Sequence, residues 1–368
     1  MDSRERTLLA IEHQEPDRVP VDCWLSSGTK RKIEAQMGKS FNDFLDYYDV
    51  DLRYIEGPRY VGPLMKTENN ADTDIWGVPR KPVDISLNDG TGVWSETYKE
   101  VTESPLQKCS TLEEIYDYSH WPSVDWFDYS CIEGQCDEIR EKGRVVVFMG
   151  DRLNRFAQLK PAMYLRGVEQ ILLDMALNPD MAQSIFSKIE EFYIEYGTRI
   201  LEAARGKIDI LCTGDDFGSQ QSMLISPLMW KELLGKGFSN FIKLGKAYGA
   251  KVMHHTCGSV YNIIEGFIEY ELDILQSIQP EAAKMDPGIL KKEFGERISF
   301  QGGISIQKVL PYGKPEDVED HVKYVFENMM AGGGYIACTA HNIQADTSIE
   351  NIKSLFNAYH KFGKYKPV

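Results

Sequence analysis

The sequence lacks any long apolar run. No window of its 368 residues approaches the roughly 18 consecutive apolar residues that a membrane-spanning helix needs. Residues 1–20 carry scattered charges and no apolar core, which argues against a secretory signal peptide. We therefore expect a soluble, cytoplasmic protein without a membrane partner.

Clusters of basic residues and a disulfide framework are missing as well. The formal net charge is −15, and no run of Lys and Arg is present that would follow a phosphate backbone, so a nucleic-acid partner is not expected. The seven cysteines are an odd number, spread widely along a chain without an export signal. This usage is typical of reduced thiols, one or two of which can be metal ligands or nucleophiles.

Several common catalytic signatures are not apparent either. We find no Ser/His/Asp hydrolase motif, no Walker loop and no GxGxxG turn after a strand. What the chain does contain is a repeated alternation of short apolar runs, polar turns and longer helical stretches. That alternation indicates parallel strands joined by crossover helices.

Eight apolar segments qualify as strands. They are residues 18–24, 52–56, 144–149, 208–212, 250–254, 272–277, 298–301 and 334–338. Most are apolar throughout, as expected for strands buried on both faces. Helical spacing of apolar residues follows at 167–178 and 185–204, and Pro227 lies near the start of another helix. Because eight such strands close a barrel, we predict a single (β/α)8 TIM-barrel domain over residues 1–368.

The alternation stops between the second and third strands. Residues 58–143 are rich in turn residues and aromatics, and the Asn-Asp-Gly turn at 88–90 between extended runs predicts a hairpin. The stretch is too short and too polar to hold a core of its own. We therefore predict an insertion that lies over one end of the barrel.

In a parallel barrel the loops after the strands hold the active site, so polar groups at the strand ends are candidates for function. These groups are Asp22, Trp24, Glu56, Asp151, Asn154, Arg155, Asp215, Asp216, residues 254–257, Gln279, Gln301, Cys338 and residues 341–344. We expect several of them to face one cavity.

The pair His255 and Cys257 is the sharpest local feature. An imidazole and a thiolate two residues apart at a strand end can bind one zinc ion, which normally needs three or four protein ligands. Either His341 or Cys338 can supply a third. We favour His341, because Cys338 still lies within the last predicted strand, whereas His254 would point to the opposite face of its strand.

Other residues at the strand ends have two interpretations each. Asp215 and Asp216 can serve as a general base, a carboxylate beside a metal or a substrate acceptor, but they can equally cap a helix. The Gly302-Gly303 pair permits close approach of a ligand or simply a tight turn. The indole rings of Trp24, Trp76 and Trp94 can line a pocket or pack in a core.

Segments along the whole chain resemble the uroporphyrinogen decarboxylase superfamily. The resemblance lies in residues 3–20, 215–220, 252–258, 300–304, 332–336 and 340–344, and it extends in order from residue 3 to Asn351. It implies a TIM barrel with one of two chemistries. The true decarboxylases bind a tetrapyrrole through an arginine-rich segment after the first strand. Here residues 22–28 contain no arginine, and Lys30, Arg31 and Lys32 that follow predict a solvated helix face.

The second branch that the chain resembles contains cobalamin-dependent methyltransferases. These enzymes use a zinc site of the form His-x-Cys with a distant third ligand. His255 and Cys257 match that pair, and the downstream ligand falls at or near His341, with Cys338 three residues earlier. The corrinoid of such enzymes arrives on a separate carrier protein, so the barrel needs no cobalamin-binding motif.

We therefore predict a zinc- and corrinoid-dependent methyltransferase, with His255, Cys257 and His341 as ligands and Cys338 as the alternative third ligand. Glu56, Asp215 or Asp216 would assist near the metal, and Gln301, Gly302 and Asn342 would contact the cofactor. The small-molecule partner would be a methoxylated aromatic, which would make the protein an O-demethylase, or a methylamine-type compound or a thiol.

Two alternatives stay open at the level of sequence. One is a decarboxylase of a tetrapyrrole or a smaller acid, which the missing arginine segment disfavours. The other is a non-catalytic barrel that binds a corrinoid or porphyrin, which the many reactive groups at the strand ends disfavour. The sequence leaves the oligomeric state open, with a homodimer as one alternative.

Overall fold

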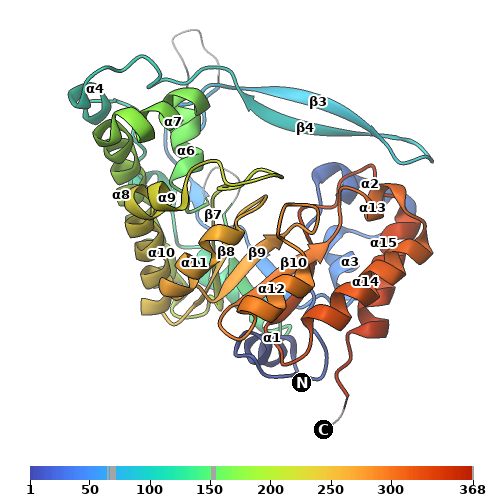
Figure 1. Ribbon diagram of the computed structural model, residues 1–368. Coiled ribbons are helices and arrows are strands. Elements are labelled where there is room, and N and C mark those ends of the chain that lie inside the picture. The colour runs from blue at the N-terminus through green and yellow to red at the C-terminus, as the bar shows by residue number, and fades with distance from the viewer. Residues whose placement is uncertain (64–65, 67–71, 151–154, 367–368) are drawn as a thin grey trace.

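A curled parallel sheet forms the centre of the protein (Figure 1). The computed structural model describes residues 1–63, 66, 72–150 and 155–366. Seven strands follow one another in the sheet in chain order and are all parallel. They are β1 (Leu52–Ile55), β6 (Val145–Phe148), β7 (Ile210–Gly214), β8 (Lys251–His255), β9 (Ile274–Ile278), β10 (Ser299–Ile304) and β11 (Tyr335–Thr339). The fold is therefore α/β and TIM-barrel-like, and seven of the eight predicted strands are confirmed.

The prediction of a strand at residues 18–24 was wrong. Val21 makes only a single parallel bridge, to Ala337 of β11, and the amide of Asp22 donates to the carbonyl of Ala337 at 2.8 Å. On the other side the amide of Asp51, next to β1, donates to the carbonyl of Val21 at 2.8 Å. The segment is extended and touches both edges of the sheet, but Pro20 has no amide hydrogen with which to continue a ladder.

The apolar strands bury both of their faces. Alternate residues such as Leu52, Val147 and Ile274 pack together on the concave face, where Ile11 of α1 (Ser3–Ile11) joins them. The hydroxyl of Ser299 donates to the carbonyl of Ile11 at 3.1 Å, which places α1 at the amino ends of the strands. Helix α1 therefore covers the amino ends of the strands, so a functional site is expected at their carboxyl ends.

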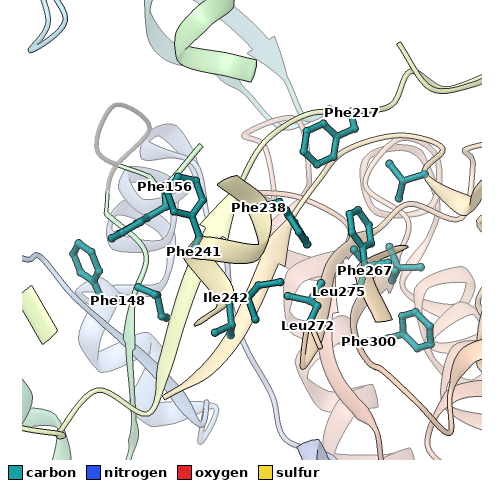
Figure 2. Packing of buried hydrophobic residues seen from close by; sticks show 14 of the residues in the cluster. Phe148, Phe156, Phe217, Phe238, Phe241, Ile242, Phe267, Leu272, Leu275 and Phe300 are labelled. Carbon is teal, nitrogen blue, oxygen red and sulfur yellow. The ribbon is translucent and has the colours of Figure 1, made fainter. Parts of the chain in front are cut away.

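The convex face of the sheet packs against helices. Figure 2 shows the aromatic and aliphatic side chains of this layer, among them Phe156, Phe241 and Phe267. The rings of Phe156 and Phe241 meet edge to face with centroids 5.8 Å apart. Each such buried ring stabilises the fold by roughly 1.5–3 kcal/mol relative to its exposed state.

Helices fill the connections between the strands. Between β6 and β9 lie α6 (Leu159–Arg166), α7 (Val168–Leu177), α8 (Pro179–Ala204), α9 (Pro227–Leu233), α10 (Gly235–Ala247), η2 (Tyr261–Ile263) and α11 (Ile264–Glu269). After β9 follow α12 (Pro287–Phe294), α13 (Val309–Tyr312), α14 (Pro315–Met329) and α15 (Ile349–Phe362). The helices predicted at 167–178 and 185–204 are confirmed as α7 and α8, and Pro227 is the first residue of α9. Among the described residues no helix is both long enough and apolar enough to span a membrane.

The segments before β1 and between β1 and β6 complete the chain. Before β1 lie α2 (Ser27–Met37) and α3 (Phe41–Tyr47). Between β1 and β6 lie β2 (Arg59–Tyr60), β3 (Arg80–Asn88), β4 (Val93–Val101), α4 (Leu112–Tyr116), η1 (Val124–Trp126), β5 (Phe127–Asp128) and α5 (Ile132–Arg140). The hairpin predicted around the Asn-Asp-Gly turn is confirmed as β3 and β4, which pair antiparallel. That residues 58–143 are an insertion into a single domain stays a prediction.

The β3–β4 hairpin lies at the end of the molecule opposite α1 and the two termini and extends toward α2 (Figure 1). Two acidic side chains of the hairpin attach it to α2. The carboxylate of Glu96 accepts hydrogen bonds from the hydroxyl of Ser27 at 2.9 Å and from the amide of Gly28 at 3.0 Å. Asp89 in the turn forms an ion pair with Lys32, and both side chains are fully buried.

The burial of Lys32 corrects the prediction that residues 30–32 form a solvated face. Its ammonium group also donates to the carbonyls of Ala345 and Thr347 at 2.7 and 2.8 Å. A buried ammonium needs such partners, since an unpaired charge in the interior is costly. Lys32 therefore joins α2, the hairpin turn and the loop that follows β11.

Candidate metal centre and its cavity

A cavity of about 650 Å³ opens at the carboxyl ends of the strands. Its walls include the aromatic side chains of Trp24, Trp76, Tyr98 and Tyr164, of which Tyr98 belongs to the hairpin. Its charged and metal-binding groups include Arg155, Lys160, Asp216, His255 and His341. The cavity has the size of a small-molecule site and combines an apolar wall with a few polar groups.

Three metal-binding side chains meet at this cavity. One donor atom from each of His255, Cys257 and His341 lies within 4.8 Å of the other two. The Sγ atom of Cys257 is 3.5 Å from Nε2 of His255. Bonds from zinc of about 2.0–2.3 Å place neighbouring tetrahedral donors roughly 3.5 Å apart, so this pair already has the spacing of a zinc site.

The position of His255 follows from the alternation of β8. His255 is the last residue of this strand and faces the concave side, whereas His254 faces the helices. Nδ1 of His254 is 2.8 Å from the hydroxyl of Thr213, and its ring stacks on Phe217. Burial, assisted by the positive charge of Arg155, lowers the pKa of His254 to about 3. His254 is therefore a neutral core residue.

The imidazole of His255 is held in one tautomer. Its Nδ1 lies against Oε1 of Gln276, and because this oxygen can only accept, Nδ1 carries the hydrogen and Nε2 keeps its lone pair. The ring stacks on Trp24 with centroids 5.5 Å apart. Burial lowers the pKa of His255 well below its ordinary value, with Arg155 as the second cause. A neutral imidazole with an unprotonated Nε2 is the form that binds a metal.

Asp215 and Asp216 have different environments. Asp215 is buried and accepts the backbone amides of Gln158, Leu159 and Lys160 at 2.6–2.7 Å, so it caps the start of α6. Burial raises its pKa to about 6 in spite of these three hydrogen bonds. Asp216 lines the cavity, where its Oδ1 is 3.7 Å from Nε2 of His255 and its other oxygen pairs with Lys160. Of the two carboxylates, Asp216 is the one beside the metal ligands.

The structure does not bring every expected residue to the cluster. Cys338 lies within β11 and is fully buried, whereas His341 follows the strand and lines the cavity. Glu56 is exposed and is not among the residues that line the cavity. Asp151 and Asn154 lie outside the described residues.

The three residues expected to contact a cofactor differ in whether they line the cavity. Asn342 lines the cavity. Gln301 is fully buried, and its amide donates to Asp22 at 2.5 Å. Gly302 lies at an irregularity of β10, where an added Cβ would be 2.7 Å from the backbone nitrogen of Ile278. Close packing of two strands is thus sufficient to explain this glycine.

Sequence reasoning missed a polar network beneath the cluster. The hydroxyl of Tyr54 donates to Asp22 at 2.6 Å, and the indole of Trp24 donates to that hydroxyl at 2.7 Å. Gln276 was not singled out either. The signal for it was a glutamine within an otherwise apolar strand, which demands a buried hydrogen-bond partner.

The fold and the cluster together define a TIM-barrel-like protein with a candidate metal centre at the carboxyl ends of its strands. The model of the uroporphyrinogen decarboxylase (URO-D) family matches residues 156–362, which is more than half of the chain. The chain belongs to the uroporphyrinogen decarboxylase family. Membership of this family supports an enzyme.

The chain is also similar to solved structures. A methyltransferase from Methanosarcina mazei superposes with a TM-score of 0.70 at 17% identity, over 98% of this chain and 99% of that chain. A 3-keto-D-glucoside 4-epimerase from E. coli gives a TM-score of 0.41 at 10% identity, over 63% of this chain and 84% of that one. The first likeness shows a shared fold, and the second is too weak to carry an argument. No curated protein sequence matches the chain.

Proposed function

We propose that the protein is a zinc-dependent methyltransferase that moves a methyl group between a small methylated substrate and a corrinoid held by a partner protein. The observation that carries this proposal is the convergence of His255, Cys257 and His341 at a substrate-sized cavity. The methyltransferase from Methanosarcina mazei has the same fold and so supports this branch of the family.

The donors fit zinc in their chemistry. Imidazole nitrogen and thiolate sulfur suit this ion, and three protein ligands leave the fourth position open for a substrate, as in catalytic zinc sites. Nε2 of His255 has a free lone pair, because Nδ1 donates to Gln276. When bound, zinc would supply Lewis-acid stabilisation of the alkoxide or thiolate from which the methyl group departs or to which it returns.

The protein's own side chains would position the substrate and transfer a proton to or from it. Asp216, beside the ligands and paired with Lys160, is placed to accept or deliver a proton at the substrate heteroatom. The aromatic walls contributed by Trp24 and Tyr98 would exclude water from the reacting groups. Asp215, which caps α6, would fix the start of that helix and with it the position of Lys160.

Metal content is the first test. Protein purified without chelators is expected to contain one zinc per chain, and Cys257→Ala is expected to lose it. Free cob(I)alamin can then replace the carrier protein as methyl acceptor, with methylcobalamin formation followed by absorbance for methoxylated aromatic, methylamine-type and methylthiol donors. Absence of stoichiometric zinc, or its retention in Cys257→Ala, would remove this proposal. Release of carbon dioxide from uroporphyrinogen would replace it with decarboxylation.

A further inference from the structure

Arg155 is a cation of the cavity wall that has no acidic partner among the described residues. Its Nε atom is buried and makes no hydrogen bond there, and its Nη2 atom approaches only the sulfur of Met149, at 3.3 Å. Arg155 is half-buried, so its guanidinium group is partly withdrawn from water without a carboxylate beside it among the described residues. Such a side chain is suited to bind an anionic ligand.

The other charges around the cavity are already compensated or solvated. Lys160 pairs with Asp216, and Asp215 is satisfied by three backbone amides. Glu100 on the hairpin is exposed to solvent. Among the described side chains that line the cavity, Arg155 is therefore the cation without a compensating carboxylate.

The fold makes room for this side chain beside the metal ligands. A Cβ at Gly214 would lie 2.4 Å from Cδ of Arg155 and 3.0 Å from Cβ of His255, so only glycine in β7 lets the arginine pass there. The amide of Gly214 donates to the carbonyl of Phe156 at 2.8 Å, which fastens the backbone next to Arg155 to β7. The guanidinium also lies 5.7 Å from the centre of the Trp24 ring.

We propose that Arg155 binds the carboxylate of an aromatic substrate, so that the methyl donor or product belongs to the methoxybenzoate class. This inference rests on the proposed methyltransferase function and names its substrate. The planar guanidinium group matches a carboxylate with two parallel hydrogen bonds. The walls formed by Trp24, Trp76, Tyr98 and Tyr164 suit the faces of an aromatic ring.

The test compares an acid with its uncharged isostere. Binding of 3,4-dimethoxybenzoate and 3,4-dimethoxybenzamide to the purified protein is measured by calorimetry and by quenching of tryptophan fluorescence. The wild type is expected to bind the acid more tightly than the amide by a factor on the order of ten to a hundred, as for a charge-assisted hydrogen bond that the amide cannot match. Arg155→Met is expected to abolish this preference, and Arg155→Lys to retain part of it.

Two controls keep the result interpretable. Arg59→Met removes an arginine whose side chain is 73% exposed, and it should leave the preference unchanged. Arg155→Gln repeats the neutral substitution in case Arg155→Met does not fold, with circular dichroism as the check on both.

The outcomes separate this inference from the function on which it rests. Equal affinity for acid and amide in the wild type, no binding of either, or an undiminished preference in the neutral variants would overturn the assignment of Arg155. The wild type could instead prefer the acid in a way that depends on Arg155, yet transfer no methyl group to cob(I)alamin. That result would support the anion site at Arg155 and contradict only the proposed methyltransferase function.

Discussion

The Nδ1 hydrogen of His255 is donated to Oε1 of Gln276, the residue directly opposite it on the neighbouring strand. Gln276 is in turn paired in register with Gln301, whose amide donates to the buried carboxylate of Asp22. Nε2 of Gln276 and Oε1 of Gln301 have no hydrogen-bond partner among the described residues, and they are a donor and an acceptor on adjacent strands. A layer of polar side chains thus runs across the concave face from Asp22 to His255.

This arrangement predicts that Gln276 sets the affinity for zinc without touching the metal. Gln276→Leu removes the acceptor that orients the ring of His255, and zinc affinity is expected to fall by about 10- to 100-fold, as for other outer partners of ligating histidines. Gln276→Glu keeps an acceptor oxygen and should retain most of the affinity. Competition with a chromophoric chelator measures the effect.

A matched substitution controls for the loss of a glutamine as such. Gln183 lies on α8, where its amide donates to the hydroxyl of Ser187 at 3.4 Å in an exposed contact, and Gln183→Leu should not change zinc affinity. If Gln276→Leu binds zinc as tightly as the wild type, the tautomer of His255 is not controlled from this strand.

The third ligand is a separate prediction. His341→Ala is expected to lower zinc content well below one per chain, because His341 supplies the third donor of the cluster. Cys338→Ala is expected to keep zinc, since Cys338 is fully buried within β11 and burial holds the pKa of its thiol well above the ordinary value. Elemental analysis of both variants decides the matter. Loss of zinc in Cys338→Ala with retention in His341→Ala would reverse the assignment.

The sequence was sufficient to locate most of the sheet. Fully apolar runs predicted β6 to β11 to within a few residues, because strands buried on both faces leave a continuous signal. The segment at 18–24 was mistaken for a strand because its composition is right, while Pro20 breaks the ladder that would make it regular. Strand propensity is a property of single residues, whereas a regular hydrogen-bond ladder between strands needs a backbone N–H donor at every pairing position.

The candidate site, like the sheet, could be predicted from the sequence only in part. His255 and Cys257 are close in sequence. His341 could be predicted to lie near them because the carboxyl ends of parallel strands meet at one edge of the sheet. Nothing local distinguishes the buried Lys32 from its exposed neighbour Arg31, because the partners of Lys32 come from a distant hairpin and from the loop after β11. Glu56 follows a predicted strand end as well, yet it points to solvent.

The ion pair between Lys32 and Asp89 predicts a pH-dependent stability. Burial by itself raises the pKa of Asp89, but the hydrogen bond from Lys32 and those within the turn outweigh it, and the net pKa lies below its ordinary value. A depressed carboxyl pKa stabilises the folded state at pH values above the unfolded pKa of about 4, and this contribution disappears as the pH falls through the lower folded pKa. Asp89→Asn is therefore expected to destabilise the protein at pH 7 by about 3 kcal/mol, because it leaves a buried ammonium without its counterion.

Urea unfolding at a series of pH values between 7 and 3 checks this expectation. The difference between wild type and Asp89→Asn should shrink once the pH falls below about 4. Asp84→Asn, on the exposed part of the same hairpin, keeps an oxygen that can accept the hydrogen bond from Thr97 and breaks no buried ion pair, so it should cost little. A difference between wild type and Asp89→Asn that stays constant over the whole pH range would contradict the ionic origin of the attachment.

Gly302 distinguishes a packing role from a ligand-binding one. Its φ of +120° disfavours any side chain, and a Cβ there would lie 2.7 Å from the backbone nitrogen of Ile278. Gly302→Ala is expected to destabilise the protein by at least about 2 kcal/mol, since backbone strain and a contact with another strand's backbone add together. Gly249→Ala is the matched control, because Gly249 also has a positive φ of +77° but nothing within 4 Å of an added Cβ. The excess cost of Gly302→Ala over Gly249→Ala in chemical denaturation then measures the close approach of β10 to β9. A Gly302→Ala protein as stable as the Gly249→Ala control but weaker in binding dimethoxybenzoate or a corrinoid would return Gly302 to the role of a cofactor contact.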